Sequence, residues 1–337
     1  MEQTNKWQAH AARLWRLRTS GDFTALALEL FRLHFRHNPV YRDYVSRVFP
    51  ALREAEVTHE SQIPFLPIEL FKSHKVLLEG CEAAGYFASS GTTSGRTSRH
   101  WLVEPRLYEE SCVHGFEYAF GPVADYTFLA LLPNYLEQRH SSLVHMMRTL
   151  MAHSPSPYHG FYLNETDRLA EVLRQTEAEG RKVLLMGVTF ALLDLAEKGW
   201  PGFPLRHVRV METGGMKGRR KEIVREELHA ILKQAFGLSH IYSEYGMCEL
   251  FSQAYLHEDG WFVCPPWMRV RLRSVYDPLR AAGAGESGGI DVIDLANLYS
   301  CPFIATQDLG RQAPDGRFTV LGRFDGSDIR GCNLMVQ

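Results

Sequence analysis

Residues 181–215 read RKVLLMGVTFALLDLAEKGWPGFPLRHVRVMETGG, two short apolar runs on either side of a longer amphipathic one. The short runs, 181–188 and 207–215, are typical of buried strands, and 189–198 has the pattern of a helix. Strand, helix and strand in this order are typical of a parallel sheet whose strands are joined by crossover helices. The stretch therefore predicts an α/β protein.

The same alternation extends on both sides of this stretch. We expect strands at 127–133, 160–163 and 239–246, and helices at 140–152, 165–179 and 219–235. Residues 5–18, 22–37 and 39–52 have helical patterns, whereas after residue 250 short strand patterns alone remain, at 261–264, 269–275, 288–296, 303–310 and 317–324. We therefore predict a helical segment packed on the body (1–80), a first α/β subdomain (81–205), and a second one (206–337) with a small strand-rich C-terminal section.

Composition excludes several classes of protein. The chain has 337 residues, is 45% hydrophobic, and carries a formal net charge of -2 without a basic segment, so we expect no nucleic-acid partner. Its six cysteines form no C-x-x-C pair, and no apolar run is long enough to cross a membrane. We expect a cytoplasmic protein without a membrane span. Residues 5–20 are rich in arginine and free of acids, as in a transit peptide, although the pattern of a docked helix is the favoured interpretation.

Residues 86–101, YFASSGTTSGRTSRHW, concentrate hydroxyl groups and glycines between two apolar ends. Glycines permit backbone conformations in which consecutive N–H groups and hydroxyls point at one anion, so the run suits phosphate oxygens. It is not a Walker loop, because no Gly-Lys-Ser/Thr follows. A polar surface linker is the alternative interpretation. The residues that we assign to phosphate binding are Ser89, Ser90, Gly91, Thr92, Thr93, Ser94 and Gly95.

Three later stretches occur with this loop in a fixed order. They are YSEYGMCEL at 242–250, TQDLG at 306–310 and GRFDGSDIRG at 322–331. The four together resemble the motifs of the adenylate-forming superfamily, which contains acyl-CoA synthetases, luciferases and peptide-synthetase adenylation domains. The resemblance implies the layered α/β large domain of that superfamily, without its mobile C-terminal domain, and ATP and Mg²⁺ as cofactors.

The resemblance also implies roles for individual residues. Ser90, Thr92, Thr93 and Ser94 would grip the β- and γ-phosphates, and Glu249 would hold Mg²⁺ near the α-phosphate. Tyr245, followed by Gly246, would stack on adenine opposite Gly214 and Gly215. Asp308 would accept hydrogen bonds from the ribose, with Arg323 as a second ribose or phosphate contact. Two assignments stay open. The cation of the triphosphate is Arg96, Arg99 or neither, and Lys72 or Lys217 is the candidate to replace the usual catalytic lysine.

The last residues resemble one subfamily more closely. SDIRGCNLMVQ, together with IPFLPIELFKSH at 63–74 and TGGMKGRR at 213–220, is similar to the LuxE acyl-protein synthetases of bacterial fatty-acid reductase complexes. The resemblance implies that a carboxylic acid, expected to be fatty, passes from its adenylate to Cys332 and then to a partner similar to an acyl-CoA reductase. A small buried hydrophobe is the other interpretation of Cys332. His140 is assigned a substrate-orienting role, with a solvated histidine as its alternative.

Two other functions compete with acyl-protein synthesis. An acyl- or aryl-CoA ligase of the phenylacetate-CoA ligase type shares much of the sequence pattern. A nucleotide-binding subunit that steadies a partner enzyme without catalysis is the third possibility. The sequence leaves the oligomeric state open, including a homo-oligomer.

Overall fold

The computed structural model describes residues 9–89, 97–132, 139–198, 202–214 and 223–324. Its described strands form a sheet of twelve strands in the order β11-β12-β13-β14-β10-β9-β8-β7-β6-β4-β5, with β1 paired to β13, and a separate hairpin of β2 and β3. One hydrophobic core runs through both halves of this sheet. The fold is therefore mixed α/β, as the sequence predicts.

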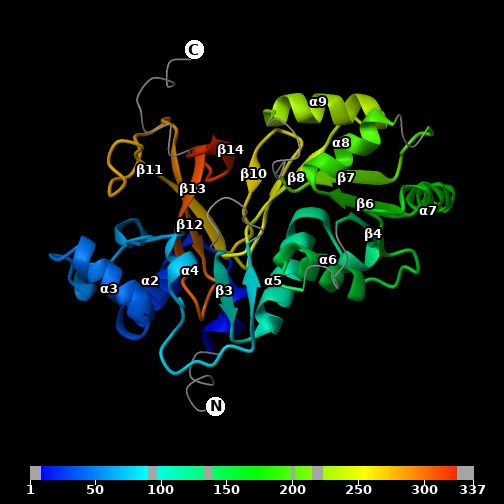
Figure 1. Cartoon of the computed structure of the whole chain (residues 1–337). Helices are drawn as coiled ribbons and strands as arrows, with labels where there is room; N and C mark the ends of the chain where they lie inside the picture. Colours follow the sequence, from blue (N-terminus) through cyan, green and yellow to red (C-terminus); the bar gives the residue numbers. More distant parts are fainter. Residues whose placement is uncertain (1–8, 90–96, 133–138, 199–201, 215–222, 325–337) are drawn as a thin grey trace.

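The parallel half of the sheet holds five strands. They are β4 (Tyr126–Leu131), β5 (Gly160–Phe161), β6 (Lys182–Gly187), β7 (Val208–Glu212) and β8 (Tyr242–Tyr245). Helices cover both faces, with α8 (Thr189–Glu197) and α9 (Arg225–Phe236) on one side and α5 (Pro105–Phe120) and α6 (Ser142–Ala152) on the other, while α7 (Thr166–Ala178) lies at the far end (Figure 1). Burial on both faces explains why β4 and β6 are apolar runs without alternation.

The antiparallel half continues from β8. It contains β9 (Ala254–Leu256), β10 (Phe262–Val263), β11 (Met268–Arg273), β12 (Gly288–Asp294), β13 (Phe303–Gln312) and β14 (Phe318–Arg323). β1 (Leu66–Pro67) pairs in parallel with β13 through Leu66 and Ile304. The chain segment before the polar loop is thereby fixed beside the strand that carries Asp308.

The N-terminal helices dock on the antiparallel half through a buried polar contact. α2 (Ser20–His37) begins with a capping box on Thr19, and Asn38 caps α3 (Pro39–Val48). His34 and Asn38 are fully buried and bond to the backbone carbonyls of Leu298 and Ser300, at 3.0 and 2.5 Å. Buried polar groups require such partners, so these hydrogen bonds fix the position of α2 and α3 relative to residues 298–300.

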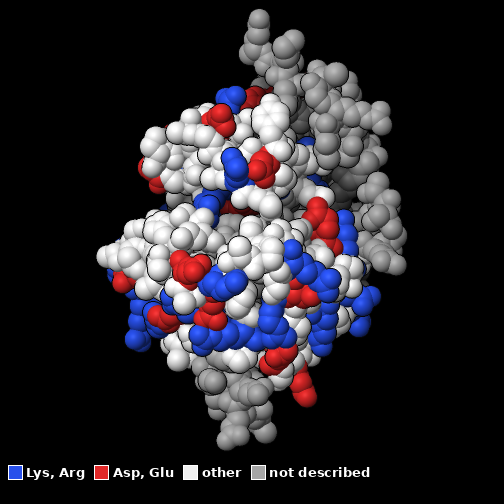
Figure 2. All heavy atoms as spheres, turned by 90° about the vertical axis from the view of Figure 1, so that its left-hand side faces the viewer, with Lys and Arg blue, Asp and Glu red and all other residues white. Residues whose placement is uncertain are grey.

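The face that α2 and α3 form carries many basic side chains (Figure 2). Acidic side chains lie among them, and several arginines are paired: Arg36 with Glu54, Arg42 with Glu79, and Arg47 with Asp43. Exposed pairs of this kind contribute little to stability. They do neutralise much of the local positive charge.

Most predicted elements are present within a few residues of their expected bounds. Several elements escaped the sequence analysis. They are the long helix α5, the strand β9, the short elements β1 and α4 (Leu70–Ser73), and the hairpin of β2 (Gly85–Ala88) and β3 (Arg99–Leu102) on either side of the polar loop. The pattern of α5 was missed because its buried positions include Ser111 and Gly115, which have no apolar signature. No helix among the described residues is long and apolar enough to cross a membrane.

Candidate active site

The site lies where β7 and β8 end. Parallel strands present their carboxyl ends at one edge, and ligands of open α/β sheets bind beyond that edge. Thr213 and Gly214 follow β7, and Gly246 and Met247 follow β8. Gly214 has a φ of +71°, which L side chains rarely adopt, and its N–H donates to Oε2 of Glu212 at 2.6 Å.

Glu212 holds the turn after β7. It is 3% exposed, and its Oε1 lies 3.7 Å from His229 Nε2 and 3.8 Å from Arg225 Nε, both on α9. Burial disfavours the charged form, but the hydrogen bonds from His229 and Ser243 and the charge of Arg225 keep the pKa of Glu212 below its usual value. Glu212 is therefore an ionised buried carboxylate beside the proposed adenine wall.

The loop after β8 is fixed by the turn after β12. Both Phe251 and Ser252 donate their backbone N–H to Oδ2 of Asp294, at 2.8 and 2.9 Å. Asn297 Nδ2 donates to the carbonyl of Glu249 at 2.8 Å, and Asn297 Oδ1 accepts from the N–H of Phe251. All of these groups are buried. The loop that carries Glu249 is thus held in one conformation.

Glu249, the predicted Mg²⁺ ligand, is 5% exposed and lies beside Cys248. Mg²⁺ at nucleotide sites commonly takes one or two carboxylates, with phosphate oxygens and waters completing the octahedron. A single carboxylate on a rigid loop fits that donor set. The described residues contain no group of three or more His, Cys, Asp or Glu that could hold a metal ion, and a metal shared with phosphates needs none.

Three of the predicted nucleotide residues meet at β8, β13 and β14. The hydroxyl of Tyr245 donates to Oδ2 of Asp308 at 3.0 Å, and Arg323 Nε lies 3.4 Å from Oδ1. Asp308 and Arg323 are cross-strand partners in the β13–β14 ladder. Burial raises the pKa of Asp308, while Arg323 and Tyr245 oppose that rise. The Tyr245 ring is 7% exposed and contacts Phe318 and Phe262.

The two ends of the polar loop are joined by hydrogen bonds between Ser89 and Ser98. Ser89 N–H donates to the carbonyl of Ser98 at 3.2 Å, and Ser98 N–H donates to Oγ of Ser89 at 3.0 Å. Ser89, assigned to phosphate binding, therefore uses its hydroxyl to close the hairpin. The other phosphate-loop residues, Ser90, Gly91, Thr92, Thr93, Ser94 and Gly95, lie outside the described residues, as do Arg96, Gly215, Lys217 and Cys332.

A buried histidine connects this hairpin to the loop of Glu249. Nδ1 of His100, on β3, lies 2.9 Å from the carbonyl oxygen of Cys248 and so carries the proton. Nε2 accepts from the hydroxyl of Ser300 at 2.8 Å, and the ring stacks on Phe251 at 4.7 Å. Burial lowers the pKa of His100 to about 4. A neutral histidine thus ties together two motifs that are about 150 residues apart in the chain.

His140 lies on the other side of the hairpin. Its ring stacks on Tyr86 of β2, with centroids 4.2 Å apart, and its carbonyl accepts from the N–H of Ala88 at 2.9 Å. The side chain is exposed. His140 therefore supports the strand that leads into the polar loop, and its role toward a substrate stays a prediction.

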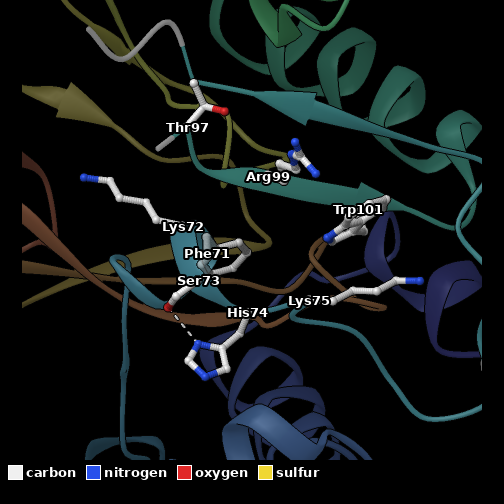
Figure 3. A pocket seen from close by; sticks show the side chains of 8 residues that line it. All are labelled: Phe71, Lys72, Ser73, His74, Lys75, Thr97, Arg99 and Trp101. Carbon is white, nitrogen blue, oxygen red and sulfur yellow. Dashed lines mark hydrogen bonds between the residues drawn. The ribbon is translucent and has the colours of Figure 1, made fainter. Parts of the chain in front are cut away.

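A hollow of about 400 Å³ lies between β3 and α4 (Leu70–Ser73), next to the end of the polar loop (Figure 3). Three cations line it, Lys72, Lys75 and Arg99, and its lining contains no carboxylate. Lys72 extends away from Trp101, whereas Lys75 extends along the ring of Trp101 (Figure 3). Lys72 and Arg99, each left open by the sequence, thus line one basic hollow.

A second, smaller hollow of about 90 Å³ lies beyond β7 and β8 on the side of α5 and α6. Glu244, Gln253, Ser142 and Thr213 contribute its polar groups, and Tyr108, Met146 and Met247 contribute apolar surface. Gly246 lines it as well, so it opens next to the loop of Tyr245.

Sequence reasoning missed several residues that build the site: Glu212, Glu244, His100, Asp294 and Asn297. One signal was available, because GGIDVIDLANL places Asp294 and Asn297 in an otherwise apolar stretch. Such residues are buried only with partners, so they indicate a buried polar network. Which loop they bind is not readable from local sequence.

No protein-family model and no curated protein matches the chain. Solved structures do match over most of its length. A 2-hydroxyisobutyryl-CoA ligase in an open conformation, in complex with 2-HIB-AMP and CoA, has a TM-score of 0.64 at 13% identity and aligns with 92% of this chain and 77% of its own. ATP-bound MatB from Rhodopseudomonas palustris has a TM-score of 0.51 at 18% identity, over 85% of this chain and 58% of its own. A long-chain-fatty-acid-CoA ligase, FadD1 from Archaeoglobus fulgidus, has a TM-score of 0.53 at 15% identity, over 72% of this chain and 51% of its own. The chain therefore has the fold of the adenylate-forming ligases.

Proposed function

We propose that the chain joins a carboxylic acid to the α-phosphate of ATP. A carboxylate oxygen attacks the α-phosphorus, the bond from that phosphorus to the bridging oxygen breaks, and pyrophosphate leaves with the electron pair. The product is an acyl-AMP. Carboxylates are poor acyl donors because their leaving group would be oxide, and the adenylate replaces oxide by AMP.

One observation carries this proposal: residues from distant motifs converge on one edge of a sheet with the ligase fold. Asp308 accepts from Tyr245 and faces Arg323, while the loop of Glu249 is bonded to the hairpin that carries the polar run. Asp308 is an acceptor for the ribose hydroxyls, because a carboxylate has more acceptor sites than Tyr245 and Arg323 occupy.

The charge of the triphosphate needs neutralisation throughout the reaction. Lys72 and Arg99 line the hollow next to the polar loop and would supply positive charge there. Glu249 would hold Mg²⁺, which when bound neutralises phosphate charge and withdraws electrons from the phosphorus. Backbone N–H groups of the polar loop would complete the set of donors.

We further propose that Cys332 accepts the acyl group from the adenylate. The Cys332 thiolate would attack the acyl carbon, the bond from that carbon to the AMP oxygen would break, and a thioester would form. A cytoplasmic partner similar to an acyl-CoA reductase would then take the acyl group. Transfer to free CoA is the second candidate, since the 2-hydroxyisobutyryl-CoA ligase structure is a complex with 2-HIB-AMP and CoA.

Exchange of labelled pyrophosphate into ATP tests the first step. A panel of carboxylic acids should give exchange that depends on both the acid and Mg²⁺, and Glu249→Gln should reduce it strongly. Glu79→Gln, on the surface near α3, is the matched control. Nucleotide binding without acid-dependent exchange for any acid would instead favour a non-catalytic binding subunit.

Labelled acid tests the second step. Incubation with ATP should leave label on the protein, releasable by hydroxylamine, and Cys332→Ser should abolish it. If wild type and Cys332→Ser retain equal label, the carrier role is wrong. If wild type and Cys332→Ser convert added CoA to acyl-CoA at the same rate, the protein is an acyl-CoA ligase and not an acyl-protein synthetase.

A further inference from the structure

The smaller hollow beyond β8 is lined in part by the polar side chains of Glu244 and Gln253. Glu244 lies on the face of β8 turned toward α5, and its Oε1 comes so close to Gly246 that a Cβ there would lie only 2.1 Å away. The carboxyl group is therefore folded against the backbone at the mouth of the hollow. No hydrogen bond or ion pair joins it to any other residue that the structure describes.

Two further polar atoms near this carboxyl have no partner. Oε1 of Gln253, which also lines the hollow, is buried without a hydrogen bond within the described part of the chain. The hydroxyl of Tyr255, the cross-strand partner of Glu244, is likewise buried and unpaired there. Gln253 is 4% exposed and Tyr255 2%. An unpaired buried polar group destabilises a protein, so such groups indicate a ligand that satisfies them.

The charges around Glu244 favour a donor over an acceptor. The ionised Glu212 on β7 is its charged neighbour, Tyr108 and Cys112 of α5 and Tyr255 of β9 are neutral, and among the described residues no cation acts on it. Burial, and then the charge of Glu212, raises the pKa of Glu244 to about 8. Both carboxyl oxygens and the Gln253 amide oxygen can accept hydrogen bonds from a ligand, and an ammonium group would also offset the negative potential.

We infer that the acid activated here carries a hydrogen-bond donor, an amino or hydroxyl group, on its acyl part, and that Glu244 and Gln253 bind this donor. The inference rests on the proposed function, because it takes the hollow next to Gly246 as the place of the acyl group. It differs from the expectation of a plain fatty acid, which would offer no hydrogen bond to the half-buried Glu244 carboxyl group or to the buried Gln253 amide oxygen. A site built to hydrogen-bond a substrate group strongly rejects analogues that lack the group.

Matched trios of acids test this inference. Each trio keeps the skeleton and carries amino, hydroxyl or methyl at one position: β-alanine, 3-hydroxypropionic and butyric acid; 4-aminobutyric, 4-hydroxybutyric and valeric acid; 4-amino-, 4-hydroxy- and 4-methylbenzoic acid. Pyrophosphate exchange should favour a donor-bearing member over its methyl analogue by at least about tenfold in kcat/KM. Glu244→Leu should abolish that preference. Glu244→Gln, nearly the same in shape, should retain a hydroxyl preference and lose an amino preference.

Binding of the same acids, measured by thermal shift with a nonhydrolysable ATP analogue, separates this inference from the proposed function. Exchange that favours the methyl members, or a preference that survives Glu244→Leu, overturns the inference while acid activation stands. Donor-selective binding that depends on Glu244 without any exchange overturns the proposed function alone. Donor-bearing acids that neither bind nor react overturn both. Unchanged melting temperatures of the two variants show that they fold.

Discussion

Single residues of this site owe their chemistry to burial and to one or two partners. Asp308 is 9% exposed, accepts from Tyr245 and faces Arg323 across a strand pair. Five cysteines of the described chain are unpaired, and burial raises their thiol pKa, to about 12 for Cys264 and Cys301. A thiol with a raised pKa is a poor nucleophile, so burial disfavours a nucleophilic role for these five.

Asp308→Asn should weaken nucleotide use with little effect on folding. The amide keeps the shape of the side chain but has one acceptor oxygen, so the proposed contact to the ribose would lose a charged hydrogen bond worth about 1.5–3 kcal/mol. We expect the KM for ATP in pyrophosphate exchange to rise about ten- to a hundredfold. Asp315→Asn, in the exposed turn before β14, is the control. An unchanged KM would remove Asp308 from the nucleotide site.

Lys72→Met should impair exchange more than Lys75→Met does. Both changes remove a cation from the basic hollow and keep an unbranched side chain. Lys72 extends away from Trp101, whereas Lys75 lies against the Trp101 ring. We expect a loss of about tenfold in kcat/KM for ATP with Lys72→Met, the effect of one weakened phosphate contact. Steady-state kinetics of both variants decide it. Equal effects would contradict a specific phosphate contact of Lys72.

At the level of elements, sequence patterns were reliable where one period persists. Strands β4, β6 and β7 and helices α6–α8 match the prediction closely, because each strand is apolar on both faces and each helix has an apolar face. Helix α9 begins at Arg225, six residues after its predicted start. The β2–β3 hairpin escaped because each strand is four residues long and its buried positions include His100, a polar residue. Its position depends on tertiary hydrogen bonds to Cys248 and Ser300, which no local pattern encodes.

The same limit applies to the site. Tyr245, Asp308 and Arg323 were predicted from motifs, and the structure brings them together. Glu244 lies within a motif but has no predicted role, because its importance comes from unpaired neighbours on β9 and just before it. Those neighbours are identified by packing and not by spacing in the sequence.

His100→Phe should uncouple the hairpin from the loop of Glu249. Phenylalanine keeps the stack on Phe251 but removes the hydrogen bonds to Cys248 and Ser300, which leaves their buried groups unpaired. We expect a loss of about 1–3 kcal/mol in the free energy of unfolding and reduced exchange activity. Urea unfolding and exchange assays measure both. His140→Phe, which keeps the stack on Tyr86, should leave stability nearly unchanged, and an equal loss would contradict a special role of His100.

On the scale of the whole molecule, buried histidines make stability depend on pH. Burial lowers the pKa of His34 to about 3 and that of His100 to about 4, against about 6.5 in the unfolded chain. Above pH 6.5 both histidines are neutral in the folded and in the unfolded chain, so proton binding takes nothing from the free energy of unfolding. Below it the unfolded chain binds protons that the folded protein excludes, and stability is lost until the pH reaches the folded values.

Urea midpoints between pH 7 and pH 4 test this dependence. Each of the two histidines should steepen the loss of unfolding free energy by up to about 1.4 kcal/mol per pH unit. His34→Gln should remove one such contribution and flatten the curve, although its absolute stability at pH 7 is lower. His207→Gln, at an exposed position before β7, is the comparison. Parallel curves for wild type and His34→Gln would show that His34 does not govern acid sensitivity.

The pairing of β1 with β13, and of His34 and Asn38 with residues 298–300, also bears on how the chain is made. An emerging polypeptide exposes the apolar faces of α2 and α3 long before the residues that cover them leave the ribosome. Contacts between such distant segments form late and slowly. Synthesis in the cell should therefore depend on chaperones that shield the early helices, and slowing translation should not relieve that dependence.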